Sequence, residues 1–146
     1  GRLYWAVRGQ GAWCDDRRLA VSSLDRLSEA TILSSRTETK RGEWDSFNGA
    51  FQTRPTGSIA YKLSLIATGE ADASFTLVPK NEWDICAGVL LVEEAGGKIT
   101  NLDGSPVVFN RPKTLLPGLI ASNTALYEPI FALISKRYAG HLPVRS

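Results

Sequence analysis

The sequence contains no methionine, one histidine and two cysteines in 146 residues. The shortage of histidine and cysteine argues against several classes of active site. A Ser/His/Asp triad would need His141, but that residue lies in a proline-containing tail, and chain ends are the mobile part of most domains. One histidine and two distant cysteines do not make a usual zinc set. Cys14 and Cys86 lie in unlike contexts, so we expect no disulfide between them. Carboxylates and anion-binding groups remain as the source of any chemistry.

Long apolar runs and glycine-rich phosphate loops are also missing. No segment reaches the length of a membrane span, and residues 1–7 lack the charged start and apolar core of a signal peptide. We therefore expect a cytoplasmic chain with no membrane partner. The glycines at 9 and 11 lie between expected strands and do not open a helix, so they form no dinucleotide-binding loop. The absence of methionine at position 1 leads us to expect an upstream segment in the natural protein.

The composition is that of one globular domain. Hydrophobic residues make up 43% and charged residues 22% of the chain, and the length suffices for a core of its own. The 17 basic and 15 acidic residues give a net charge of +2. The basic residues are scattered and form no stripe, which argues against a nucleic-acid polymer as partner. A weakly basic surface remains compatible with small anionic ligands.

Strand and helix patterns alternate along the chain, which predicts a layered α/β fold with a mixed sheet flanked by helices. The first 14 residues predict an antiparallel hairpin. Ser58 has the character of a helix N-cap, with Gly69 closing that helix, and Asn123 caps the last one. Further strands are expected at 18–21, 31–35, 73–78, 98–100 and 119–122, and a short helix near 45–51.

The most informative segment is WDICAG at 83–88, which continues through apolar residues to EEAGG at 93–97. Residues 85–92 carry no charge, so we expect a helix covered on every side. Asp84 then lies in its first turn, where the helix dipole and free N–H groups keep a carboxylate ionised and available to a cation. The ordinary alternative is that Asp84 serves only as a helix-start acid.

The start of the helix at Gly57 and Ser58 is a candidate anion site. Free backbone N–H groups and the helix dipole favour a phosphate there, and Arg54 lies three residues earlier in the chain. An ordinary N-cap explains Ser58 equally well, and a loop arginine is commonly a solvated surface charge. A phosphate site beside a cation-binding carboxylate would suit a metal-assisted phosphate enzyme.

At this point the motifs resemble a known family. WDICAG together with EEAGG resembles the C-terminal signature of the inositol monophosphatase family. Three further segments resemble the same family in the same order: residues 3–12 its central strand pair, 34–37 its serine-arginine loop, and 57–73 its substrate-side helix. The resemblance covers essentially the whole chain.

The resemblance implies a Mg²⁺-dependent, Li⁺-sensitive phosphomonoesterase with α-β-α-β-α layers, usually a homodimer, acting on a small phosphorylated substrate. It assigns residues 1–30 to a central antiparallel sheet and 31–146 to a C-terminal α/β domain on the substrate side. It makes Asp84 a metal ligand, which suits the preference of magnesium for carboxylate oxygens. The substrate-binding residues implied are Gly57, Ser58 and Ile59, with Ser34, Arg54 and Thr76 as further pocket members.

Two departures from the family pattern bear on function. The family's Asp-Pro-Ile-Asp-Gly-Thr metal motif has no counterpart here, so we expect the C-terminal half of a phosphatase, inactive alone. Thr76 stands where inositol phosphatases carry a substrate-binding glutamate. PKNE at 79–82 resembles relatives that act on 3′(2′),5′-bisphosphate nucleotides, in which case Lys80 would meet a second phosphate; the ordinary alternative is that Lys80 is a solvated surface lysine. An inositol phosphatase, a bisphosphate nucleotidase and a non-catalytic binding module from a truncated or split gene therefore stay open.

Overall fold

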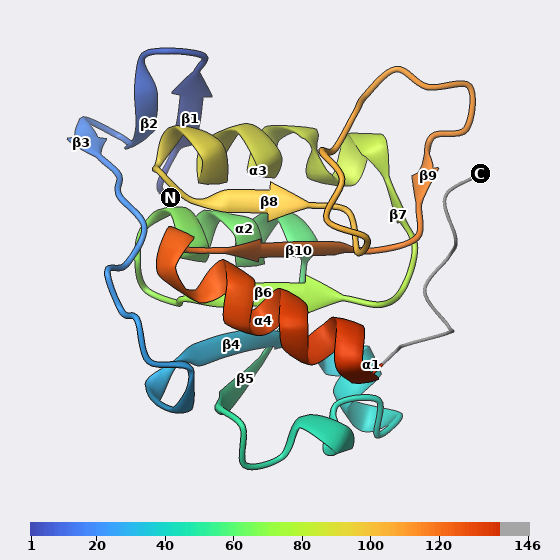
Figure 1. Cartoon of the computed structure of the whole chain (residues 1–146). Coiled ribbons are helices and arrows are strands. Elements are labelled where there is room, and N and C mark those ends of the chain that lie inside the picture. Colours follow the sequence, from blue (N-terminus) through green and yellow to red (C-terminus); the bar gives the residue numbers. More distant parts are fainter. Residues whose placement is uncertain (138–146) are drawn as a thin grey trace.

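A five-stranded sheet in the order β5-β4-β6-β10-β8 organises the computed structural model, which describes residues 1–137 (Figure 1). β4 pairs in parallel with both β5 and β6, whereas β10 pairs antiparallel with both β6 and β8. The predicted mixed sheet is therefore confirmed. The strands are β4 (Thr31–Ser35), β5 (Gln52–Thr56), β6 (Ala73–Thr76), β8 (Lys98–Thr100) and β10 (Leu119–Ser122).

Helices cover both faces of this sheet. α2 (Ile59–Ala67) and α3 (Glu82–Glu94) lie on one face, and α4 (Thr124–Arg137) lies on the other (Figure 1). Side chains alternate along a strand, so neighbouring residues of β4 serve different layers. Ile32 packs in the cluster that includes α4, and Leu33 packs with Leu65 of α2. Two hydrophobic layers thus hold the sheet from both sides.

An antiparallel hairpin forms a further layer beyond α3. It consists of β1 (Tyr4–Val7), β2 (Gly11–Cys14) and the two-residue β3 (Arg17–Arg18), in that order. The hairpin is confirmed, but the strand expected at 18–21 is shorter than predicted. Leu19 still donates its N–H to the carbonyl of Ala12 in β2 at 2.8 Å, and the chain then turns to α3, where Val21 donates its N–H to the carbonyl of Ala95 at 3.0 Å.

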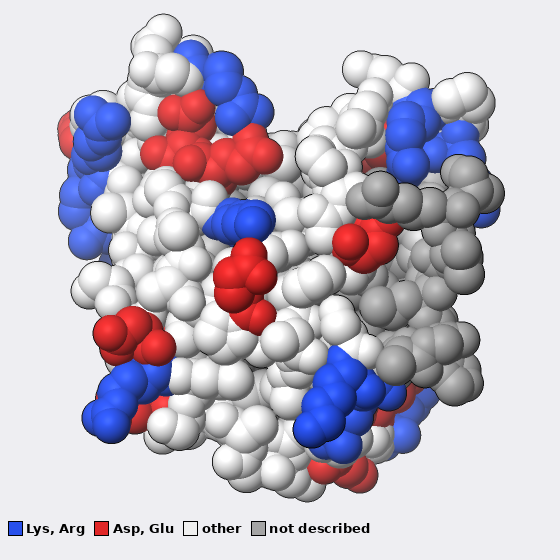
Figure 2. All heavy atoms as spheres, viewed as in Figure 1, with Lys and Arg blue, Asp and Glu red and all other residues white. Residues whose placement is uncertain are grey.

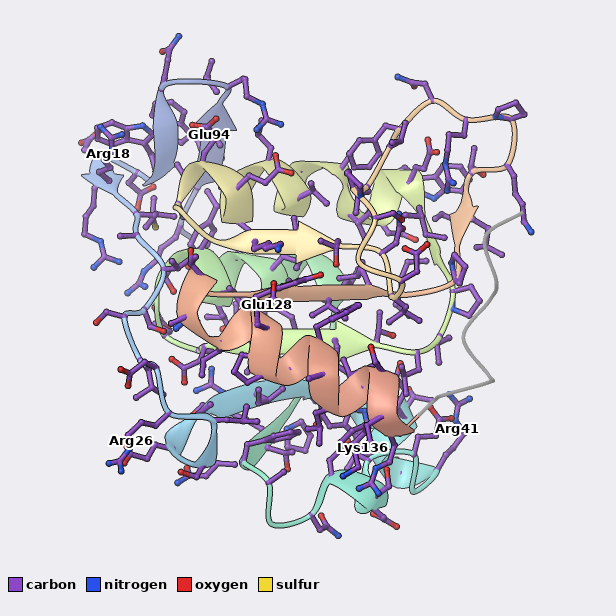
Figure 3. All side chains as sticks on the ribbon, viewed as in Figure 1. Arg18, Arg26, Arg41, Glu94, Glu128 and Lys136 are labelled. Atoms are coloured by element: carbon purple, nitrogen blue, oxygen red, sulfur yellow. The ribbon has the colours of Figure 1, made fainter. Side chains whose placement is uncertain are left out.

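A carboxylate at the end of α3 fastens the hairpin to the helix. Glu94 accepts the Gly9 N–H at 2.8 Å and the Gly11 N–H at 3.0 Å, one on each oxygen. Arg8 pairs with Glu93 at 2.6 Å. Figure 3 shows Glu94 rising from α3 toward the hairpin turn, and Figure 2 shows acidic side chains next to a basic one at this place. Both glycines have positive φ, which presents their N–H groups to one acceptor.

Local capping follows the sequence expectation. The Ser58 hydroxyl accepts the Tyr61 N–H at 3.3 Å at the start of α2, and Gly69 follows its last turn with φ +76°. The Asn123 side chain accepts the Leu126 N–H at 2.9 Å at the start of α4. Each cap satisfies a backbone group that the helix leaves unpaired.

Several short elements were missed or misplaced in the sequence interpretation. The polar run after Ser35 forms α1 (Arg36–Lys40), because the Ser35 hydroxyl accepts the Glu38 N–H. The helix expected near 45–51 is a single 3-10 turn, η2 (Asp45–Phe47), and the edge strand β5 lies at 52–56, where no strand was expected. A proline is tolerated at an edge strand, so Pro55 did not exclude it. The remaining short elements are η1 (Leu27–Glu29), β7 (Lys80–Asn81) and β9 (Leu115–Leu116).

The expectation that α3 is covered on every side is wrong. Trp83 is 66% exposed, and Cys86 and Ala87 are exposed as well. The hairpin packs only on the later part of the helix, at Leu91 and Ala95. Figure 2 shows the surface hollowed between the hairpin and the 104–116 segment, where the first part of α3 lies. Both cysteines, Cys14 and Cys86, are free. His141 lies outside the described residues.

Candidate functional site

The site residues gather at one edge of the five-stranded sheet. The parallel strands β4 and β6 end at this edge, and both α2 and α3 begin there (Figure 1). The two helices pack closely, because a Cβ at Gly88 of α3 would overlap the Leu63 side chain of α2. Carboxyl ends of parallel strands meeting helix starts form a usual place for ligand sites in α/β sheets.

Asp84 lies in the first turn of α3, as predicted, and it is exposed. Within residues 1–137 its carboxylate makes no hydrogen bond or ion pair. Asn81, the N-cap residue, provides no side-chain cap. The positive end of the helix dipole therefore acts on a carboxylate to which no group of residues 1–137 is bonded. This arrangement leaves Asp84 available to a cation.

Asp84 belongs to no cluster of three or more potential metal ligands in the described part of the chain. Residues 1–137 contain no group of three or more His, Cys, Asp or Glu side chains suited to a metal. Glu82, two residues before Asp84, is buried and accepts the backbone N–H groups of Asn110 at 2.8 Å and Arg111 at 3.3 Å. It fastens the loop before β9 to the start of α3. The donor set here does not by itself fit a complete Mg²⁺ site.

Gly57, Ser58 and Ile59 form the start of α2, the predicted anion site. Ser58 adopts φ +63° and its hydroxyl already serves as the helix cap. The exposed Arg36 guanidinium lies over Gly57, since a Cβ built on that glycine would be 3.8 Å from Arg36 Nη1. Arg36 was not singled out from the sequence. Its position directly after the two serines of the SSRT segment is the signal that could have identified it.

The other predicted pocket members lie in different surroundings. Arg54 is exposed on the edge strand β5, opposite Leu33. Ser34 is buried, and its hydroxyl accepts the Thr39 hydroxyl at 3.0 Å. Thr76 is buried at the end of β6, where it donates to Glu38 at 2.6 Å. Only Arg54 of these three reaches the surface through an exposed side chain.

Two buried charges at this edge were missed by the sequence interpretation. Glu38 of α1 is 2% exposed, and Lys62 of α2 is 3% exposed. Burial, the largest effect, lowers the pKa of Lys62 below 10.5; the Glu38 carboxylate raises it and the Lys80 ammonium lowers it. No hydrogen bond or ion pair to the Lys62 ammonium occurs in the described residues. A lysine within an amphipathic helix pattern normally indicates the solvated face, so periodicity could not find it.

Comparison with known proteins agrees with the family resemblance found in the sequence. The model of the inositol monophosphatase family matches residues 1–138. A fructose-1,6-bisphosphatase/inositol-1-monophosphatase of Methanothermobacter thermautotrophicus is 34% identical over 135 residues, covering 89% of this chain and 48% of that protein. The putative Nus factor SuhB of Neisseria meningitidis is 33% identical over 110 residues, covering 70% and 42%.

The fold has close structural counterparts. Inositol monophosphatase-II of Staphylococcus aureus superposes with a TM-score of 0.84 at 23% identity, over 99% of this chain and 55% of that one. The chain spans about half the length of the curated relatives that it matches.

Proposed function

Because this chain belongs to the inositol monophosphatase family, we propose that it forms the substrate-side half of a Mg²⁺-dependent phosphomonoesterase. The substrate class is inositol monophosphate or a related small phosphate ester. The observation that carries the proposal is the exposed, unengaged Asp84 carboxylate at the start of α3, on the edge where α2 also begins. A cation-binding acid and an anion-binding helix start are the two requirements of metal-assisted phosphate hydrolysis.

Asp84 is the residue that we assign to Mg²⁺. When bound, the metal would neutralise phosphate charge and lower the pKa of the attacking water. The described residues supply one free carboxylate of the several that such a site needs, so the other ligands come from outside residues 1–137. This chain contributes one metal ligand, Asp84, in a fixed orientation. It also presents the backbone groups of Gly57, Ser58 and Ile59 to the substrate. Ser34, Arg54 and Thr76 belong to the same proposal as pocket members.

Activity assays of two proteins test this assignment. We expect no Mg²⁺-dependent phosphate release by the 146-residue chain, because its metal ligands are incomplete. The product of the complete reading frame should hydrolyse one of three esters: inositol 1-phosphate, fructose 1,6-bisphosphate or adenosine 3′,5′-bisphosphate. In that product, Asp84→Asn should lower activity by roughly 10- to 100-fold or more, whereas Asp16→Asn, at an exposed turn, should leave activity unchanged. Magnesium-dependent turnover by the isolated chain would refute the proposal that this chain holds only part of the metal site.

A bisphosphate nucleotide is the second candidate substrate, and Lys62 favours it. This ammonium is buried at the site edge with no partner among the described residues, and Lys80 lies near enough to lower its pKa. Two neighbouring cations suit a second phosphate better than they suit a hydroxyl of inositol. The carboxylate that Thr76 contacts, that of Glu38, has both oxygens hydrogen-bonded. Glu38 therefore does not take the place of the glutamate that Thr76 replaces.

The Lys62→Met variant separates the two substrates. It removes the ammonium and keeps the length of a buried side chain. In the complete protein it should raise KM for adenosine 3′,5′-bisphosphate by about tenfold, the loss of one charge-assisted contact, with little change for inositol 1-phosphate. An equal effect on both esters, or exclusive turnover of the inositol ester by the unmodified protein, would remove the nucleotide candidate.

A non-catalytic module is the alternative from another class. One relative is named a putative Nus factor, SuhB, so a family member can carry a name that describes no hydrolysis. If the product of the complete reading frame releases phosphate from none of the three esters in the presence of Mg²⁺, the non-catalytic module is favoured over the enzyme.

The remaining properties implied by family membership form part of the same proposal. They are inhibition by Li⁺, assembly as a homodimer and a cytoplasmic location. In residues 1–137, no helix has the length and apolar character needed to cross a bilayer.

A further inference from the structure

The start of α3 is held by a neighbouring segment and not by a cap of its own. The first N–H groups of a helix have no partner inside that helix. Asn81, the N-cap residue, provides no side-chain cap, and within residues 1–137 the Asp84 carboxylate makes no hydrogen bond. The pattern in which an acid at the third helical position reaches back to the N-cap is therefore absent. The first turn of this helix depends on contacts with other segments.

The 104–116 segment, drawn in orange between β8 and β9, supplies these contacts (Figure 1). β9 pairs with β7 directly before the helix. The Glu82 N–H donates to the Thr114 carbonyl at 3.0 Å. The Glu82 carboxylate accepts the backbone N–H of Asn110 on Oε2 at 2.8 Å and that of Arg111 on Oε1 at 3.3 Å. Glu82 thus joins the helix start to this segment through both its backbone and its side chain.

The two N–H groups converge on one carboxylate because of the local backbone. Asn110 adopts φ +62°, in the left-handed region, which asparagine enters more readily than most residues do. Successive N–H groups in such a conformation form a concavity that binds an anion. Arg111 adds its enclosed Nε, which lies 3.6 Å from Glu82 Oε1 and has no hydrogen-bond partner among the described residues. The buried carboxylate is therefore both paired and hydrogen-bonded, which offsets the cost of its burial.

This attachment fixes the direction of Asp84. An α-helix turns by about 100° per residue, so side chains two positions apart point about 200° apart, to nearly opposite sides of the helix. Glu82 is 7% exposed and bonded to the 104–116 segment, whereas Asp84 is exposed. Rotation of the first turn about the helix axis would break the bonds of Glu82 and move Asp84 at the same time. Because Glu82 is held, Asp84 is kept on the exposed side.

We propose that Glu82 is a positioning residue, whose attachment to the 104–116 segment sets the orientation of the first turn of α3 and thereby points the Asp84 carboxylate outward. This rests on the proposed function of the same site, since it takes Asp84 as a cation ligand. Glu82 itself binds no cation, because its side chain is buried and both its oxygens accept hydrogen bonds. The two acids of the EWD run at 82–84 therefore have different tasks.

Amide hydrogen exchange in the 146-residue chain tests the effect of Glu82 on the first turn. Glu82→Gln keeps the length of the side chain, but its amide has one oxygen for two backbone N–H groups. Exchange at Asn110 or Arg111 should become roughly tenfold faster, the loss of one hydrogen bond. Exchange should also become faster at Cys86, whose N–H donates to the Glu82 carbonyl in the first turn. A Cys86 amide that exchanges as in the unmodified chain overturns the proposal.

Metal binding to the complete protein tests the effect on Asp84. Mn²⁺ suits the same oxygen ligands as Mg²⁺, and the paramagnetic resonance signal of the free ion gives both the number of bound ions and their Kd. For the site that Asp84→Asn abolishes, Glu82→Gln should raise Kd about tenfold, the lower end of the range for groups that orient a metal ligand. A merely structural role would reduce the number of sites and leave Kd unchanged, and that result contradicts the proposal.

Two variants keep the attachment and serve as controls. Asn110→Gly retains both backbone N–H groups, and glycine adopts the left-handed backbone without strain. Glu128→Gln makes the same chemical change at an exposed position of α4, on the other face of the sheet (Figure 3). In both, Cys86 exchange and the Kd for Mn²⁺ should stay within about twofold of the unmodified protein. Equal effects of Glu128→Gln and Glu82→Gln would refute a specific role of Glu82.

Two further outcomes are decisive. If Glu82→Gln does not fold, Glu82→Gln/Arg111→Met removes both charges of the pair and should fold with fast exchange at Cys86. A double variant that is unfolded too, or that protects Cys86 as the unmodified chain does, overturns the proposal. If the complete protein binds no Mn²⁺ while Cys86 exchange is still accelerated in Glu82→Gln, the metal function proposed for Asp84 fails, and the effect of Glu82 on the first turn stands.

Discussion

At the scale of single residues, Gly118 decides how closely β10 approaches the end of β6. A Cβ built there would overlap the Thr76 carbonyl oxygen and lie 2.8 Å from Leu102 Cδ1. Leu119, the next residue, is paired with Thr76 across the two strands. The glycine is required by this close approach and not by a left-handed backbone. The close approach occurs at Thr76, whose hydroxyl donates to Glu38.

We expect Gly118→Ala to destabilise the fold by about 1–3 kcal/mol or more, since a backbone carbonyl cannot yield as a side-chain tip does. Urea unfolding monitored by tryptophan fluorescence measures the change. Gly57→Ala is the matched control: its Cβ would meet only ordinary contacts with the Arg36 side chain, so the free energy of unfolding should stay within about 0.5 kcal/mol. Equal stability of the two variants would contradict this account of Gly118.

At the scale of elements, the Glu94 carboxylate joins the hairpin to α3. Backbone hydrogen bonds from Gly9 and then Gly11 lower the pKa of Glu94 below 4.5, and Arg8 adds a smaller effect in the same direction. A carboxyl group with a depressed folded-state pKa contributes stability above its unfolded pKa, and that contribution is lost as the pH falls through the folded value. The hairpin should therefore loosen only in acid.

Amide hydrogen exchange at Gly9 and Gly11 measures this attachment directly. Glu94→Gln has one carbonyl acceptor where the carboxylate has two oxygens, so at neutral pH these amides should exchange roughly tenfold faster than in the unmodified chain. Relative to intrinsic rates, exchange in the unmodified chain should approach that in the variant as the pH falls through the lowered pKa of Glu94. Glu70→Gln is the control, because Glu70 is exposed and receives no bond from these two glycines. Unchanged protection in Glu94→Gln would show that packing alone holds the hairpin.

At the scale of the whole molecule, the layers succeed one another as hairpin, helix pair, sheet and helix (Figure 1). The sheet is enclosed on both faces, with Phe75 buried toward α4 and Ala121 buried toward α2 and α3. The helix pair is enclosed only where the hairpin reaches it. The exposed apolar side of α3 at Trp83 and Ala87 lies beside Asp84, the residue whose proposed partners are missing. At the start of α3, therefore, the apolar side chains lack a covering layer and the proposed metal site lacks its other ligands.

Features that depend on neighbours in sequence could be predicted. The caps at Ser58 and Asn123, the position of Asp84 in its helix turn and the mixed sheet with an N-terminal hairpin follow from local propensity and periodicity, because a few adjacent residues decide them. Short elements such as β5 and β7 were not predictable in this way. Each has little propensity of its own and forms because an existing strand edge supplies hydrogen-bond partners.

The sequence by itself determined the family and the order of the main elements, and it placed Asp84 in the first turn of α3. Only the tertiary structure decided which charges share the site edge. Glu38 and Thr76 are 38 residues apart in the chain, yet their side-chain oxygens lie 2.6 Å apart. Burial of Lys62, like exposure of Trp83, depends on which layers cover α2 and α3. The physical reason is that desolvation and charge pairing act through space, so they depend on packing between segments that no local pattern connects.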